Sequence, residues 1–421
     1  MSENNLENNV LSTDLLIVGG GIAGITAAVE AAEVGKKVVL IEREHYLGGR
    51  VAQLHRYFPK ICPPTCGLEI NFRRIKNNPN ITVLTGASVG IADGDVGKYS
   101  VSVDIQPRYV TENCTACGDC EMACEVEVDD TFNLGMKKAK AIRLWHEMAY
   151  PFLYFVDEKA ASDPKMKPLE ALCPAKAIDL NMKPKSLTVN TKSIIWATGW
   201  QSYDATKLEG LNFGILPNVV TNMMFERISA QNGINEGKIV RPSDGGDVKS
   251  IAFVQCAGSR DRNHLPYCSA ICCMASLKQT RYVREQYPDA EIHVFFIDAR
   301  TPGRWEDFYQ TVQDDTKTIL HRGKVAKIDE ADNGDVTLTA ENTLTRQLEQ
   351  ITVNMAVLAT GMQPNAKDEK PPVKAVMDDF GFIWQGGVIA AGVAAGPKDV
   401  AGSNQEATGA VGRALQEMEE K

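Results

Sequence analysis

Short apolar runs along the chain predict buried parallel strands, each followed by a segment with helical character. The first run is Asp14 to Val18 (DLLIV), and the residues after it, 22–35, are rich in alanine and end at Gly35. Val38 to Ile41 is a second apolar run. Runs without polar alternation are typical of parallel strands that are covered on both faces. The N-terminal segment therefore predicts a βαβ unit.

Similar runs recur farther along the chain and predict a second, comparable sheet. Residues 250–255 (SIAFVQ) are one of them, and two others, residues 193–199 and 355–361, both end in Ala-Thr-Gly. A chain of 421 residues exceeds one ordinary hydrophobic core. We therefore expect an α/β protein with two doubly wound dinucleotide-binding domains and a small insert.

A glycine loop connects the first predicted strand to its helix. Gly19, Gly21 and Gly24 have the G-x-G-x-x-G spacing. The first glycine permits a tight turn, the second lets a pyrophosphate approach the backbone, and the third lets the helix pack against the strand. The helix N-terminus offers N–H groups and partial positive charge to the phosphates. Glu42 ends the second strand, where a carboxylate can accept a ribose hydroxyl. The unit therefore predicts a nucleotide site.

Further segments favour FAD over NAD as the nucleotide. Gly48, Gly49 and Arg50 continue the first unit, as in many two-domain flavoproteins, and the Ala-Thr-Gly strands resemble the connections between nucleotide domains in the thioredoxin-reductase-like group. Residues 386–415 resemble the last FAD-contacting strand, loop and helix of that group, except that Val393 replaces its usual aspartate. The candidate cofactor-binding residues are Gly19, Gly21, Gly24, Glu42, Arg43, Gly49, Arg50, Ala197, Thr198, Gly199, Gly361 and Gly392.

The second predicted domain lacks a phosphate-binding glycine loop. Its first strand is followed by the sequence Cys-Ala-Gly-Ser-Arg, residues 256–260. The side chains of Cys256 and Ala257 stand where glycines would admit a pyrophosphate. We therefore predict that the protein does not use NAD(P)H and that its electrons enter or leave by another route.

These assignments divide the chain into six predicted segments. They are a disordered tail (1–12), the first part of an FAD-binding domain (13–107), an inserted ferredoxin-like α+β module (108–182), a linking segment of the FAD domain (183–224), a second Rossmann-like domain (225–345) and the last part of the FAD-binding domain (346–421).

Composition and charge narrow the class of partner. The net charge of −9 argues against nucleic acid or an anionic membrane surface as the main partner. No uninterrupted apolar run approaches the roughly 18–20 residues that span a bilayer. The first eleven residues are polar and rich in asparagine, unlike a secretion signal. We therefore expect a cytoplasmic protein without a membrane span.

The eleven cysteines are clustered, which in a reducing compartment indicates metal binding or redox chemistry. Cys114, Cys117, Cys120 and Cys124 have the spacing of half a bacterial two-cluster ferredoxin. In such ferredoxins the fourth cysteine, usually followed by proline, binds the other cluster. A second ferredoxin half should follow in the sequence. Only its fourth cysteine is present, as Cys173, which is followed by a proline. The other three ligand positions hold Asp163, Met166 and Leu169.

This pattern predicts one [4Fe–4S] cluster, with Cys124 left without iron. The predicted ligands are Cys114, Cys117, Cys120 and Cys173. The alternative is a zinc ion held by the first four cysteines, which their close spacing disfavours. Complete loss of metal is the other possibility.

A second group consists of Cys256, Cys268, Cys272 and Cys273, which have no ferredoxin spacing. A redox disulfide, buried thiols and an irregular cluster remain open on the residues alone.

Three cysteine-containing segments together resemble the heterodisulfide reductase A-like family. They are residues 48–66 (GGRVAQLHRYFPKICPPTC), the insert with its CPAKAID, and QCAGSRD with PYCSAICCM. The resemblance covers nearly the whole chain after residue 12 and implies FAD and a hetero-oligomeric complex. It also implies that the second cysteine group holds an atypical [4Fe–4S] cluster. Cys62 and Cys66 lie in a cysteine-containing segment of the family, and their role stays undecided.

Within this family the short form resembles the member found in quinone-interacting membrane-bound oxidoreductases of sulfate reducers. The resemblance implies electron transfer between a quinone pool and adenylylsulfate reductase. It also implies a second flavin and iron–sulfur subunit, a quinone-reactive subunit in the membrane, and attachment to the inner membrane through these partners. The alternatives are an NAD(P)H-dependent flavin disulfide reductase and a non-catalytic structural flavoprotein.

Overall fold

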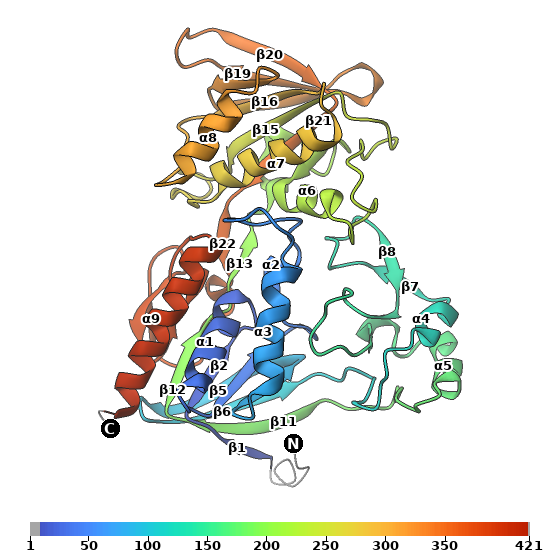
Figure 1. The fold of residues 1–421 in the computed structure, drawn as a ribbon, viewed down its shortest axis with the longest axis vertical. Helices are drawn as coiled ribbons and strands as arrows, with labels where there is room; N and C mark the ends of the chain where they lie inside the picture. The colour runs from blue at the N-terminus through green and yellow to red at the C-terminus, as the bar shows by residue number, and fades with distance from the viewer. Residues whose placement is uncertain (1–8, 420–421) are drawn as a thin grey trace.

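The computed structural model describes residues 9–419, which form two lobes and a smaller module beside the lower lobe (Figure 1). Residues 1–8 of the predicted tail lie outside the described residues. Strand β1 (Val10–Ser12) contradicts the predicted tail, because it pairs in parallel with β11 (Lys185–Thr191). The lower lobe therefore begins at β1.

The lower lobe contains a parallel sheet in the order β25-β12-β2-β3-β4. These strands are β2 (Leu15–Val18), β3 (Val38–Glu42), β4 (Ile81–Thr85), β12 (Ser193–Trp196) and β25 (Ile389–Ala390). One face packs against helices α1 (Ile22–Glu33), α3 (Thr65–Asn77) and α9 (Val400–Glu419). The other packs against a second sheet, in which β11 and β1 join β5 (Ala87–Asp95) and β6 (Lys98–Ile105).

This layering explains why the first apolar run shows no alternation. Leu15 and Ile17 of β2 face the helices, whereas Leu16 and Val18 face the second sheet, and all four are buried. The predicted strand, helix and following strand therefore form as the pattern indicates, with Gly35 in the left-handed conformation just after α1.

The upper lobe repeats the plan around a parallel sheet in the order β14-β21-β15-β16-β17. These strands are β14 (Val219–Thr221), β15 (Ser250–Ala257), β16 (Glu291–Phe296), β17 (Thr318–Arg322) and β21 (Met355–Thr360). Its helices are α6 (Asn222–Ser229), α7 (Cys272–Gln286) and α8 (Trp305–Gln313). Against the other face packs an antiparallel sheet of β18 (Val325–Glu330), β19 (Val336–Glu341) and β20 (Leu348–Val353).

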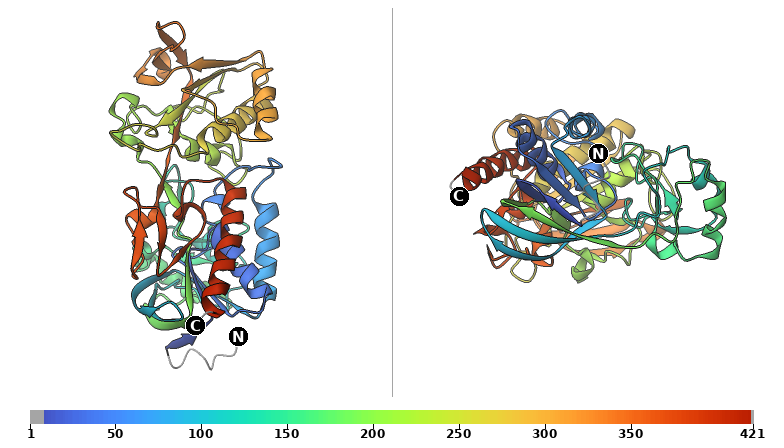
Figure 2. Two further views of the ribbon diagram at one scale, coloured as in Figure 1. Left: turned by 90° about the vertical axis from the view of Figure 1, so that its left-hand side faces the viewer. Right: turned by 90° about the horizontal axis from the view of Figure 1, so that it is seen from below.

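The predicted domain boundaries at residues 225 and 345 are wrong. Strand β21 pairs with both β14 and β15, so the second Ala-Thr-Gly strand lies inside the upper sheet rather than in the FAD-binding domain. Conversely, β11 and β12, predicted as a link, belong to the sheets of the lower lobe. The chain crosses between lobes in β13 (Trp200–Ser202) and β22 (Met362–Pro364), an antiparallel pair visible in Figures 1 and 2.

After β22 the chain returns to the lower lobe. There β23 (Ala375–Met377) and β24 (Ile383–Gly386) form a short hairpin before β25 and α9. Within residues 9–419, no helix combines the length and apolar character that crossing a bilayer requires.

The insert leaves the lower lobe at the end of β6 and returns at β11. It contains α4 (Asp119–Ala123), β7 (Glu127–Asp129), β8 (Lys138–Lys140), β9 (Ile142–Arg143), β10 (Phe155–Val156) and α5 (Pro168–Leu172). An antiparallel bridge between Val110 and Ile178 closes it, and it encloses a hydrophobic cluster of its own.

A fully buried arginine joins the two lobes and the insert. Arg227 of α6 donates through Nε to the Asn133 side chain of the insert (2.9 Å) and through Nη1 to the Gln53 carbonyl of the lower lobe (3.2 Å). Its Nη2 donates to the carbonyl and side chain of Asn232 (2.9 and 2.8 Å), and its guanidinium lies over the Phe132 ring. All three nitrogens are thus occupied by neutral acceptors.

Replacing Arg227 with methionine is expected to destabilise the protein by roughly 3 kcal/mol, since each buried acceptor left without a donor costs about 1–3 kcal/mol. The measurement is thermal unfolding of the cofactor-free protein, together with limited proteolysis of the insert. The matched control is Arg73→Met, because the Arg73 side chain is 74% exposed and its ion pair with Glu69 is worth little. Equal melting temperatures of the two variants would contradict the assigned role.

Candidate functional site: a cavity between the lobes and two cysteine groups

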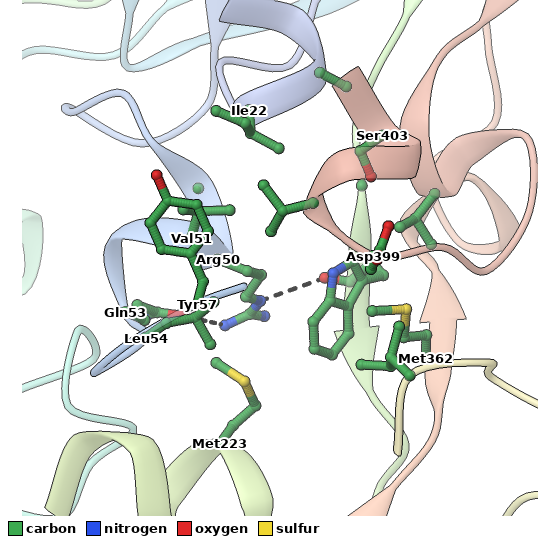
Figure 3. Close-up of a pocket in the computed structure, with 18 of the residues that line it drawn as sticks. Ile22, Arg50, Val51, Gln53, Leu54, Tyr57, Met223, Met362, Asp399 and Ser403 are labelled. Carbon is green, nitrogen blue, oxygen red and sulfur yellow. Dashed lines mark hydrogen bonds between the residues drawn. The ribbon is translucent and has the colours of Figure 1, made fainter. Parts of the chain in front are cut away.

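A cavity of about 740 Å³ lies where the two lobes and the insert meet (Figure 3). The lower lobe contributes the glycine loop, residues 42–58, the first Ala-Thr-Gly segment and the loop before α9. The upper lobe contributes residues of α6 and α7, and the insert contributes residues 131–134 and Trp145. The volume is in the range typical of cofactor sites.

The glycine loop has the geometry that its spacing predicts. Gly19 has φ +109°, and a Cβ there would overlap the Ala197 carbonyl group. A Cβ on Gly24 would overlap the Gly19 carbonyl oxygen, so only glycine lets α1 lie this close to the end of β2. Gly24 therefore acts through packing and does not itself line the cavity.

Gly21 faces open space at the N-terminus of α1. It is the residue that precedes the helix, and a Cβ built on it would meet no described atom within 4 Å. No side chain of the described residues caps this helix. Its first N–H groups thus remain available to an anion in the cavity, which is the arrangement that binds a pyrophosphate.

Glu42 is a buried carboxyl group on the cavity wall. Its Oε2 accepts from the Gly20 N–H (2.6 Å) and its Oε1 from the Glu44 N–H (2.8 Å). Burial raises the pKa of Glu42 to about 7, although both hydrogen bonds oppose the shift. A donor on a ligand, such as a ribose hydroxyl, would favour the ionised form.

The segment after β12 forms the opposite wall. Ala197, Thr198 and Gly199 line the cavity, and the buried Thr198 hydroxyl has no hydrogen-bond partner among the described residues. A hydroxyl left in this state indicates a site completed by a ligand.

Arg50 crosses the cavity, as Figure 3 shows. Its Nη1 donates to the Gln53 side chain (3.0 Å) and its Nε to the Trp200 carbonyl (3.3 Å). The Arg50 guanidinium also faces the Trp200 ring, and burial lowers its pKa. Arg50 therefore connects the segment after α2 (Gly49–Ala52) to the crossing strand β13.

The remaining predicted cofactor residues fall at different distances from the cavity. Arg43 and Gly49 line it, and the exposed Arg43 side chain pairs with Glu369. Gly392, with φ +63°, packs against Ala23 beside the wall. Gly361 does not line the cavity, because it lies in the upper lobe with Ser259 and Ser269 against it. The next residue, Met362, lines the cavity.

Sequence reasoning missed the walls that come from the upper lobe and the insert. Lys278 of α7 and Glu226 of α6 form an ion pair (3.1 Å) whose side chains are 5% and 2% exposed, and both line the cavity. Trp145 and Phe132 reach the cavity from the insert. Charged residues on helices usually face water, so the sequence carries no signal for this buried pair.

A second, small cavity in the insert brings four cysteines together. Its walls include Cys114, Cys117, Cys120 and Cys173, together with Tyr154 and Ile142. Backbone N–H groups of Ala116 and Ala177 donate to the sulfurs of Cys114 (3.4 Å) and Cys173 (3.3 Å). Burial and the nearby Cys114 raise the pKa of the Cys120 thiol to about 12.

Cys124 does not line this cavity. It is buried within the insert core, where its Sγ lies 3.4 Å from the Val126 carbonyl oxygen and 3.9 Å from the Met166 sulfur. Met166 and Leu169, at two of the lost ligand positions, are part of the same hydrophobic cluster. Apolar side chains thus fill the place where a second cluster would require thiolates.

The second cysteine group lies between the end of β15, which contains Cys256, and the first turn of α7, which contains Cys272 and Cys273. Burial raises the pKa of the Cys256 thiol to about 11, with added contributions from Cys273 and Cys268. The pKa of the Cys272 thiol is also raised, mainly by burial and to a smaller extent by the other three cysteines. The four sulfurs are therefore neighbours, and Ala270, Ile271 and Met274 of the same segment line the cavity.

The loop of the upper lobe differs from a phosphate-binding loop in length as well as in residue type. Strand β15 ends at Ala257 and α7 begins only at Cys272, whereas in the lower lobe α1 follows β2 within a few residues. Cys256 has φ +56°, and Tyr203 fills the space beside Gly258. The first turn of α7 thus begins at the cysteine group.

Among the described residues, no three histidine, cysteine, aspartate or glutamate side chains converge on a point suited to a single metal ion.

The remaining two cysteines lie close to the large cavity. Cys62 is partly buried and Cys66 is exposed, and both lie near Tyr57, which lines the cavity.

Comparison with known proteins gives matches of three kinds. Residues 14–58 match the family model described as FAD dependent oxidoreductase. The A-type subunit of the ferredoxin/F420H2-dependent CoB-CoM heterodisulfide reductase of Methanosarcina acetivorans is 33% identical over 97% of this chain and 54% of its own length. An A-type iron-sulfur subunit of the CoB-CoM heterodisulfide reductase of Methanopyrus kandleri is 34% identical over 95% of this chain and 63% of its own.

Residues 14–58 are thus similar to FAD-dependent oxidoreductases, and nearly the whole chain is similar to the A-type subunits of heterodisulfide reductases. The chain spans between about half and two thirds of the length of these relatives. Thioredoxin reductases of T. acidophilum and Lactococcus lactis superpose with TM-scores of 0.51 and 0.52 at 14% identity, covering 97% of this chain and 97% and 100% of theirs. The predicted two-dinucleotide-domain fold is therefore confirmed.

In this chain, Gly21→Ala is expected to leave the fold intact and to weaken FAD binding by roughly tenfold or more, about 1.4 kcal/mol. The added methyl group projects into open cavity, where it blocks the approach of the pyrophosphate. FAD titration and thermal unfolding of the cofactor-free protein measure the two effects. Gly412→Ala on α9 is the matched control, since its Cβ also meets no described atom, and unchanged FAD affinity in both variants would contradict the site.

FAD affinity is expected to rise with pH, because the Glu42 carboxyl must ionise to accept the ribose hydroxyl well. With a pKa of about 7, the carboxyl is mostly protonated at pH 6 and mostly ionised at pH 8. Linkage then predicts about tenfold weaker binding at the lower pH. Glu42→Gln should bind FAD more weakly than the wild type at pH 8 and lose this dependence. Affinity that is flat or falls with pH in the wild type would rule out the assigned role.

Proposed function

We propose that this chain is an FAD and iron–sulfur electron-transfer subunit of a larger redox complex. The observation that carries the proposal is the construction of the cavity, whose walls come from the flavin-binding loop and from both cysteine-bearing parts. A flavin there would lie between two groups of thiols. The flavin exchanges pairs or single electrons, and a cluster exchanges single electrons.

The insert is proposed to be a degenerate ferredoxin module with one [4Fe–4S] cluster. Cys114, Cys117, Cys120 and Cys173 share one small cavity and supply the four thiolates. The N–H groups directed at two of these sulfurs would stabilise negative charge on the cluster, which is one of the ways a protein sets its potential. The position of Cys124 also supports this set of ligands over the predicted zinc alternative.

The second cysteine group is proposed to hold an atypical cluster beside the flavin. Its ligands are Cys256, Cys268, Cys272 and Cys273, which lie together at the start of α7. Arg260 adds positive charge next to Cys256, and it pairs with Asp298. The same cysteines occupy the place where a nicotinamide nucleotide would need a short glycine loop and a free helix N-terminus, which supports a protein that does not use NAD(P)H.

The complex is proposed to place the chain in the cytoplasm, attached to the inner membrane through partners. The relatives are named as subunits of heterodisulfide reductases, and one name includes ferredoxin as an electron carrier. The finer proposal rests on the resemblance to quinone-interacting oxidoreductases. In this finer proposal the complex also contains a second flavin and iron–sulfur subunit and a quinone-reactive subunit in the membrane. Adenylylsulfate reductase is its cytoplasmic partner.

Cys173→Ser is expected to lower the iron and labile sulfide of the anaerobically purified protein and to abolish the EPR signal of the insert cluster, while FAD remains bound. Cys124→Ser, the matched control, should keep the iron, because the Cys124 sulfur contacts only apolar and carbonyl neighbours. Iron content, sulfide content and EPR of the dithionite-reduced protein measure the difference. The ligand assignment is wrong if the Cys124 variant loses the signal and the Cys173 variant keeps it.

The function itself is tested on the unmodified protein. Anaerobic preparations should contain flavin and iron, and NADH or NADPH should fail to reduce the flavin at a catalytic rate. Protein with flavin but no iron would overturn the proposal, and rapid reduction by NADPH would favour a flavin disulfide reductase instead.

A further inference from the structure

A stacked pair of aromatic rings and an adjacent tyrosine lie between the large cavity and the cysteine cavity of the insert. Trp145 lines the large cavity, and its ring lies parallel to that of Phe155, with 4.4 Å between centroids and an angle of 3° between planes. Tyr154, the residue before Phe155, lines the cysteine cavity, where its hydroxyl donates to Glu121 (2.9 Å). The three rings thus lead from one cavity to the other.

This connection is tightly packed along its length. Phe155 is 2% exposed, and in the pairing of β9 with β10, Val156 lies opposite Ile142, which lines the cysteine cavity. On the cavity side, the Tyr46 ring contacts Trp145 with 4.9 Å between centroids. Phe155 and Tyr154 are both buried, so water is excluded from this part of the path between the two cavities.

We propose that the stacked rings of Trp145 and Phe155, continued through the backbone to the neighbouring Tyr154, are the route by which electrons pass between the flavin and the cluster of the insert. This inference rests on the proposed function. A flavin held at the glycine loop would give up one electron, and a cluster held by Cys114, Cys117, Cys120 and Cys173 would accept it. The rings gain and lose no electron and no proton, because they act only as the medium between donor and acceptor.

A buried cation supports this passive role of the rings. The Arg143 guanidinium faces both the Trp145 ring (5.4 Å) and the Phe155 ring (4.7 Å), and its side chain is 5% exposed. A positive charge over an aromatic face stabilises the neutral, electron-rich ring. Removing an electron from Trp145 therefore becomes harder, which protects the tryptophan from oxidation while leaving it in place between the two centres.

The test compares internal electron transfer in Trp145→Leu, Trp145→Phe and Phe155→Leu holoprotein with the wild type. The bound flavin is reduced by laser-flash photolysis with a deazaflavin donor. Flavin absorbance and freeze-quench EPR of the insert cluster then follow the electron. Flavin, iron and sulfide content establish that each variant is fully loaded. Phe152→Leu is the control, since Phe152 belongs to the same insert but is 52% exposed and outside the stack.

Both leucine variants are expected to slow reduction of the insert cluster several-fold, with Trp145→Phe and Phe152→Leu close to the wild type. Reduction of the second cluster should keep its rate in every variant. Wild-type rates in fully loaded leucine variants would overturn the route while leaving the proposed function intact. If Trp145→Leu does not retain flavin, Phe155→Leu decides the question, because Phe155 does not line the cavity. Absence of iron from the wild-type insert would instead defeat the proposed function.

Discussion

The geometry of the cavity depends on holding three parts of the chain in register, and buried hydrogen bonds from charged groups link all three. Arg227 reaches the lower lobe and the insert from the upper lobe, and Lys278 donates to the Arg56 carbonyl across the same junction. Hydrophobic contact alone is tolerant of small shifts, whereas a buried guanidinium without its acceptors is costly. The lobes are therefore fixed by directional bonds, and the cavity walls keep their spacing.

Because both lobes and the insert line the cavity, cofactor binding depends on how these three parts are positioned relative to one another. A ligand that contacts the glycine loop, α7 and Trp145 together binds only the assembled arrangement, so its binding energy adds to the stability of that arrangement. The buried ion pair Glu226–Lys278 gives one end of the cavity a compensated charge rather than a free one. The upper lobe therefore places two opposite charges at the cavity wall that largely cancel each other.

The sequence predicts the parts whose local pattern has one physical explanation. Gly19 and Gly24 follow from close backbone approach, and the exclusion of Cys124 from the cysteine cavity follows from ferredoxin spacing. Prediction from the sequence fails where the position of a strand depends on which distant segment it pairs with. Nothing local distinguishes the two Ala-Thr-Gly strands, so only the pairing of β21 with β15 shows that Gly361 belongs to the upper lobe. Likewise, Trp145 reaches the cavity only because the insert folds back onto the lower lobe.

The insert joins the lower lobe where two paired strands end. Ile105, the last residue of β6, is paired directly with Lys185, the first of β11, and the bridge between Val110 and Ile178 continues the same antiparallel course. The whole module therefore connects the ends of two adjacent antiparallel strands, and these strands keep their register and their order in the sheet. Removing the module at this point would leave the pairing of β6 with β11, and with it the sheet of the lower lobe, unchanged.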